Sequence, residues 1–178
     1  MIFTELSVAA DIAWQIAAIE AGAAMHQFIE KEHIFIGICS LEKIILLGQE
    51  ETRLSPQAWQ SLNSECDSLK SVLKEFRFDA TRIRRKVRES LGKGNYERNE
   101  RVVHRSEACK EVFRRAGEFV MCNREVSCLH LLAALLDKPS EVIDRAFDEF
   151  QVKSANLRQS LIVQSNVRSP YETETGPP

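Results

Sequence analysis

The sequence contains no long uninterrupted run of apolar residues. A helix that spans a membrane needs roughly 18 of them in a row, and every apolar stretch here is interrupted sooner. The N-terminus also lacks the basic segment that begins a secretory signal peptide, because it carries Glu5 and Asp11 instead. We therefore predict a cytoplasmic protein without a membrane partner.

A large excess of charge of one sign is also missing. The formal net charge is -2 and the pI is about 6.1, which gives no overall attraction to nucleic acid or to an anionic membrane. Basic residues are concentrated only in residues 82–101, where eight of them stand against three acidic ones. We interpret this segment as a solvated helix face and a linker, with an acidic protein or nucleic acid as the alternative partner. Nucleic acid is the weaker alternative, because only Tyr96 offers a ring there for base stacking.

The five cysteines follow no recognisable pattern. Their number is odd and no two of them are spaced as CxxC, which argues against a disulfide framework and against the common zinc sites. We expect buried free thiols and no bound metal.

Motifs of the common enzyme classes are absent. The sequence contains neither GxxxxGK[ST] nor GxSxG, so it offers neither a P-loop for nucleotide phosphates nor the nucleophile turn of a hydrolase. We predict no enzymatic activity, no catalytic residues and no cofactor.

No segment alternates apolar and polar residues with the period of two that marks a half-buried strand. Apolar residues instead recur every three or four positions, which predicts helices throughout. A central helix over residues 33–45 is apolar on nearly all sides and should lie inside the bundle. The first helix should be capped by Thr4 and carry one apolar face of Val8, Ile12, Ile16 and Ile19.

Capping residues predict where the later helices begin and end. Ser55 followed by Pro56 should start one helix, Asp79 should start another that ends at Gly92, and Ser106 should start a third. The polar residues 92–103 read as a linker, and residues 165–178 read as a flexible tail.

The helical pattern occurs twice. Aligning His33 with His130 pairs the two apolar central segments, and it also pairs Ile12, Ile16 and Ile19 with Cys109, Phe113 and Ala116. A second block matches further on, where Leu73, Phe76, Phe78 and Ile83 correspond to Phe147, Phe150, Val152 and Leu157. The first copy then holds 23 extra residues, at about 43–66. We predict an internal duplication. We also expect this insertion to determine which partner the protein binds.

These residues resemble the Clp N repeat of the Clp family of protein unfoldases. The resemblance is carried by the alanine-rich first helix, the run from Glu32 to Gly37 and the segment around Phe76, and again by residues 109–161. It implies an all-α, pseudo-twofold bundle of two four-helix repeats, at residues 4–91 and 104–162 of a domain over residues 1–164. It also implies a non-enzymatic module that binds unfolded or tagged substrate proteins or an adaptor protein, in contact with a Clp ATPase or protease core. The alternative is a free-standing accessory or scaffolding subunit that docks on a folded Clp-type assembly.

The resemblance also suggests where a partner would bind. Some members of the family bind phosphoarginine with a glutamate in each repeat, but only Glu32 matches, because Leu129 stands at the second position. The negative charge of Glu32 also suits the positive N-terminal end of a helix. We expect His33 and His130 to pack in equivalent ways in the two repeats. We expect a groove between the repeats, and the candidate peptide- or adaptor-binding residues are Glu32, His33, Phe35, Arg84 and Arg85.

Overall fold

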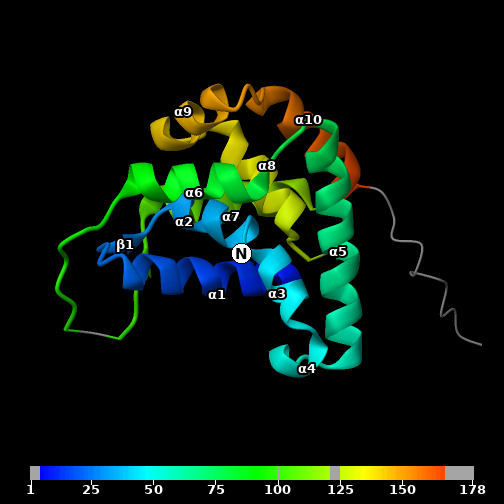
Figure 1. The fold of residues 1–178 in the computed structure, drawn as a ribbon, viewed down its shortest axis with the longest axis horizontal. Coiled ribbons are helices and arrows are strands. Elements are labelled where there is room, and N and C mark those ends of the chain that lie inside the picture. Colours follow the sequence, from blue (N-terminus) through cyan, green and yellow to red (C-terminus); the bar gives the residue numbers. More distant parts are fainter. Residues whose placement is uncertain (1–4, 100, 121–124, 167–178) are drawn as a thin grey trace, which may run out of the picture.

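The computed structural model describes residues 5–99, 101–120 and 125–166, and in this part of the chain it is almost entirely helical (Figure 1). The prediction of an all-α fold is confirmed. Predicted residue Thr4 and most of the predicted tail lie outside the described residues. The elements are α1 Val8–Ala23, β1 Phe28–Ile29, α2 Lys31–Ile38, α3 Leu41–Leu47, α4 Gln49–Thr52, α5 Pro56–Glu75, α6 Ala80–Leu91, β2 His104–Arg105, α7 Glu107–Phe119, α8 Cys128–Asp137, α9 Glu141–Glu149 and α10 Ser154–Ser165.

Most of the predicted caps hold the helix ends. Ser55, Asp79 and Ser106 each accept a hydrogen bond from a first-turn N–H of α5, α6 and α7, and Gly92 ends α6 with a φ of 69°. The prediction for the first helix was wrong, because α1 begins at Val8 and its cap is Ser7, whose Oγ accepts from the N–H of Ala10 at 3.1 Å. A serine oxygen in this place satisfies one of the free N–H groups of the first turn.

The centre of the molecule is formed by α2 and α8, as predicted for the first of them. Nearly every residue of both helices is buried. Helix α1 packs on α2 with its alanines, and Gly37 of α2 meets the backbone at Ala13. The predicted isoleucine face is therefore not the buried one, since Ile19 is 69% exposed. Small side chains on the facing surface permit the close approach of the two helices, which isoleucines would prevent.

The single helix predicted over residues 33–45 is in fact two helices. Helix α2 ends at Ile38, and α3 begins at Leu41 after a turn at Cys39 and Ser40. The guanidinium of Arg84 occupies this turn, donating from Nη1 to the Cys39 carbonyl at 3.3 Å and to the Ser40 Oγ at 3.2 Å. The Ser40 Oγ also donates to the Ile36 carbonyl at 2.6 Å. These side-chain bonds compete with a continuous helical ladder, which periodicity alone does not reveal.

The second half of each repeat has the same turn, which confirms the second block of the predicted alignment. Arg77 and Gln151 both adopt a positive φ, of 51° and 56°. Just after them, the Phe78 N–H donates to the Leu73 carbonyl at 3.0 Å, as the Val152 N–H does to that of Phe147 at 2.9 Å. The pairs α5–α6 and α9–α10 are therefore equivalent.

The predicted alignment of the first helices was wrong by two residues. The caps Ser7 and Ser106 are equivalent, so Ala17 corresponds to Ala116, and both are fully buried. The prediction had paired Ile19 with Ala116. Repeat one has two more residues between the caps of its first two main helices, and the addition falls in the first helix itself, since α1 has 16 residues and α7 has 13.

The two repeats exchange backbone contacts in a crossed pattern. Leu6, just before α1, forms a parallel bridge with Val126, just before α8, while β1 before α2 pairs in parallel with β2 before α7. The hydrogen bonds repeat as well, since the Ser7 N–H donates to the Val126 carbonyl at 2.9 Å and the Ser106 N–H to the Ile29 carbonyl at 3.0 Å. The structure thus has the predicted pseudo-twofold symmetry.

The extra residues of repeat one form α3, α4 and the first half of α5. Figure 1 shows these elements together at one end of the bundle. The linker is held against the opposite end of α1, because the Gly94 N–H donates to the Ala24 carbonyl at 2.7 Å and the Tyr96 N–H to that of Met25 at 3.0 Å. The insertion and the linker therefore lie in different parts of the surface.

Candidate functional site

The start of α2 holds two of the predicted site residues. His33 is 1% exposed, and its Nδ1 accepts a hydrogen bond from the Glu30 N–H at 2.9 Å. Its Nε2 lies 2.8 Å from Nδ1 of His26. Burial, and then the neighbouring His26, lower the pKa of His33 to about 4. Glu32, in the same turn, is only 8% exposed. His33 is thus a neutral capping residue at physiological pH.

The start of α8 repeats this arrangement. Nδ1 of His130 accepts from the Ser127 N–H at 3.0 Å, so His33 and His130 do the same structural work in the two repeats. The position equivalent to Glu32 is Leu129, which is buried. A carboxylate is nevertheless present, because Glu65 of α5 accepts from the Cys128 N–H at 2.6 Å. Burial raises the pKa of Glu65. Sequence comparison missed Glu65, since it comes from the insertion and has no counterpart in repeat two.

Two other predicted site residues lie in the interior. Phe35 is fully buried in an aromatic cluster with Phe78 and Phe147, whose ring centroids are 5.5 to 6.3 Å apart. Arg84 is 2% exposed at the turn after α2, and no carboxylate of the described residues pairs with it. Burial, and then the charge of Arg88, lower its pKa. Its charge stabilises the C-terminal carbonyls of α2. Arg85, in contrast, is exposed on α6.

The predicted site residues therefore do not form one surface. Glu32 and His33 lie at the start of α2, Phe35 in the core, and Arg84 at the end of α2, while only Arg85 is freely accessible.

Two cations of the basic segment pair with carboxylates within the molecule. Lys86 pairs with Glu149 at 2.7 Å and Arg88 with Glu20 at 2.5 Å. The Arg82 guanidinium lies 5.1 Å from the ring centroid of Phe150. These contacts reduce the number of cations that are available to the phosphates of a nucleic acid, which supports the interpretation as a solvated helix face.

The cysteines of the described residues are free and buried, as predicted; Cys122 lies outside this part of the chain. Burial raises the pKa of Cys39, Cys66 and Cys109 to about 12 and raises that of Cys128 as well. These thiols are protonated and are poor nucleophiles. The described residues contain no cluster of His, Cys, Asp and Glu that could hold a metal ion. They also form no helix that is long and apolar enough to cross a membrane.

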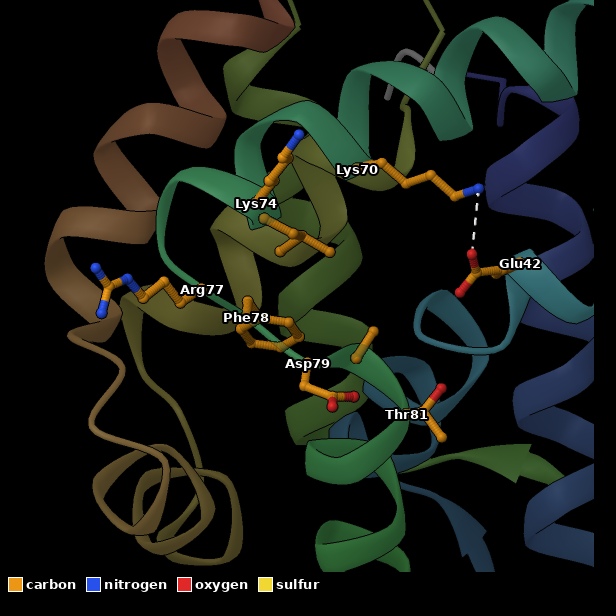
Figure 2. A pocket seen from close by; sticks show the side chains of 9 residues that line it. Glu42, Lys70, Lys74, Arg77, Phe78, Asp79 and Thr81 are labelled. Carbon is orange, nitrogen blue, oxygen red and sulfur yellow. Dashed lines mark ion pairs between the residues drawn. The ribbon is translucent and has the colours of Figure 1, made fainter.

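A pocket of about 480 Å³ opens where α3, the end of α5 and the start of α6 meet. Its lining residues are Glu42, Lys70, Leu73, Lys74, Arg77, Phe78, Asp79, Ala80 and Thr81. Figure 2 shows the ring of Phe78 between the Glu42–Lys70 ion pair on one side and Lys74 and Arg77 on the other. We call this the α5–α6 pocket. Sequence reasoning did not find it, because its residues come from three elements and form no known motif.

Helix α3, which contributes Glu42 to this pocket, also carries exposed leucines. Leu46 is 80% exposed and Leu47 is 58% exposed. Leu46 follows Glu42 by four residues, so the two side chains share one face of the helix. The insertion thus presents apolar surface on the helix that contributes Glu42 to the α5–α6 pocket.

Comparisons with solved structures identify the fold. The chain is similar to the Hsp104 N-terminal domain from Candida albicans, with a TM-score of 0.62, 16% identity and coverage of 92% of this chain and 93% of that one. It is also similar to a protein from a malarial protein secretion system, with a TM-score of 0.58, 16% identity and coverage of 89% and 92%. A third similar structure is the N-terminal domain of the caseinolytic protease associated chaperone ClpD from Arabidopsis thaliana, with a TM-score of 0.52, 13% identity and coverage of 93% and 100%. No family model and no curated protein matches the sequence. The chain has the fold of a Clp N-terminal domain, which confirms the predicted resemblance.

Proposed function

We propose that this chain is a non-enzymatic protein-binding module that receives unfolded or tagged substrate proteins, or an adaptor protein, in a Clp-type chaperone system. The observation that carries the proposal is the fold, which spans about nine tenths of the chain and of the N-terminal domains of Hsp104 and ClpD. The buried protonated thiols and the capping histidines also argue against catalysis at these positions.

The surface of the insertion supports binding of extended protein segments. Two adjacent leucines on α3 remain largely exposed, although the chain buries most of its other leucines. Exposed apolar side chains that lie together are typical of protein-interaction surfaces. We therefore place the apolar contact with the partner at Leu46 and Leu47.

The proposal is tested by fluorescence anisotropy of a labelled, permanently unfolded protein titrated with this chain at low and high salt. We expect saturable binding that tolerates salt, because an apolar contact is not screened by ions. Leu46→Ser combined with Leu47→Ser should weaken the affinity about tenfold. Both leucines would become partly buried in the complex, and their loss from the contact costs on the order of 1 to 2 kcal/mol of binding free energy.

Val163→Ser provides a matched control. Val163 is 59% exposed on α10, so its replacement changes surface hydrophobicity away from α3 and should leave the affinity unchanged. Absence of binding by the unaltered chain would overturn the proposal. It would favour the alternative of a subunit that docks on a folded Clp-type assembly.

A further inference from the structure

The α5–α6 pocket has two cations that are not neutralised. Glu42 pairs with Lys70 at 3.3 Å, but neither Lys74 nor Arg77 forms an ion pair with any acidic group of the described residues. Lys70 and Lys74 are four residues apart on α5, and like charges at this spacing repel one another on a helix. An anionic ligand would relieve this repulsion.

The pseudo-twofold symmetry shows that the fold does not require these charges. In repeat two, the residues equivalent to Lys70 and Lys74 are Asp144 and Asp148, and Gln151 replaces Arg77. The same structural positions thus carry opposite charge in the two repeats. The basic character belongs to repeat one alone, next to the insertion.

The pocket is also apolar at its base. Phe78 is 8% exposed and Leu73 is 7% exposed, so both are held by the core and move little. Leu46 of α3 adds apolar surface beyond the Glu42–Lys70 pair. A ligand that fits has carboxylates beside a large apolar side chain.

We propose that the α5–α6 pocket binds an acidic, apolar peptide segment of a partner protein. Carboxylates of the segment pair with Lys74 and Arg77, and an adjacent apolar side chain lies on Phe78. This inference rests on the proposed function of a protein-binding module and specifies the chemistry of the segment that is bound.

The test uses two labelled peptides and the whole chain. One peptide carries glutamates beside leucine and phenylalanine, and its twin carries lysines in place of the glutamates. The pocket variant combines Lys74→Asp with Arg77→Gln, which installs the residues of repeat two; Gln151 shows that glutamine accepts the positive φ found at Arg77. The control variant combines Lys153→Asp with Lys93→Gln, which makes the same change in net charge at exposed positions outside the pocket.

We expect the unaltered chain to bind the acidic peptide at least about tenfold more tightly than its basic twin, as two charge-assisted contacts provide. The pocket variant should lose about tenfold in affinity, and the control variant should stay within about twofold at moderate salt. Equal affinity of the unaltered chain for the two peptides, or equal loss in the two variants, would overturn the inference.

The unfolded-protein titration separates the two proposals. If the chain binds unfolded protein but does not discriminate between the peptides, the pocket assignment fails and the proposed function stands. If it binds neither probe, both fail. Concentration-dependent self-association that Asp148→Lys abolishes would assign the pocket to the acidic face of a second copy and would overturn the peptide assignment.

Discussion

Gly37→Ala should lower the free energy of unfolding by about 3 kcal/mol or more, the upper range for overpacking of a core. A Cβ at this position would lie 2.1 Å from the carbonyl oxygen of Ala13 and 3.0 Å from its carbonyl carbon. Both contacts are with backbone, so no side chain can rotate away, and α1 and α2 would have to separate. Urea denaturation followed by circular dichroism measures the change.

Gly22→Ala is the matched control. Gly22 also lies in a helix, but an added Cβ would meet only side-chain atoms, at 3.6 Å in Arg98 and 3.8 Å in Val103. Because alanine is the better helix former, this variant should be neutral or up to about 1 kcal/mol more stable. Similar destabilisation by both substitutions would contradict the close approach of α1 and α2.

A second large effect is expected from acid. The pKa of His33 is lowered from 6.5 to about 4 in the folded protein. Between these two pH values the unfolded chain binds a proton at His33 and the folded chain does not. The stability that neutral His33 provides is complete above about pH 6.5 and is lost as the pH falls through about 4. The loss amounts to about 3 kcal/mol over this range, at 1.36 kcal/mol for each pKa unit.

The contribution of His33 is isolated by comparing variants at pH 7 and pH 4. His33→Gln keeps an acceptor for the Glu30 N–H, as glutamine does in other capping boxes, and removes the titrating ring. We expect a shallower loss of stability with falling pH in this variant. His26→Gln should give an intermediate slope, because His26 contributes to the lowered pKa of His33. An unchanged slope in His33→Gln would show that other groups cause the acid sensitivity.

Most of the fold could be predicted from the sequence because local sequence patterns specify the helices and the turns between them. The caps at Ser55, Asp79 and Ser106 act on their own first turns, and the turn between α5 and α6 recurs between α9 and α10. One failure involves partners that are distant in sequence. The break between α2 and α3 depends on Arg84, which is 44 residues from Ser40.

The site was harder to predict for the same reason. A buried capping histidine and an exposed binding histidine have the same sequence signature, and only tertiary contacts distinguish them. Likewise, Glu65 accepts a hydrogen bond from the N–H of Cys128 at the start of α8, which is 63 residues away in the sequence. The α5–α6 pocket requires that α3 return to the end of α5, an arrangement that no periodicity specifies.

The crossed backbone contacts give the chain the topology of a fused dimer. Each repeat starts its first main helix beside the segment that precedes the second main helix of the other repeat. A single repeat would lack these partners, whereas two copies of one repeat could supply them to each other as a symmetric homodimer. Residues 92–103 convert that bimolecular encounter into an intramolecular one, at the millimolar effective concentration typical of short tethers. Once the two halves are joined, each is free to diverge, and this freedom permits a lysine pair in one half and an aspartate pair in the other.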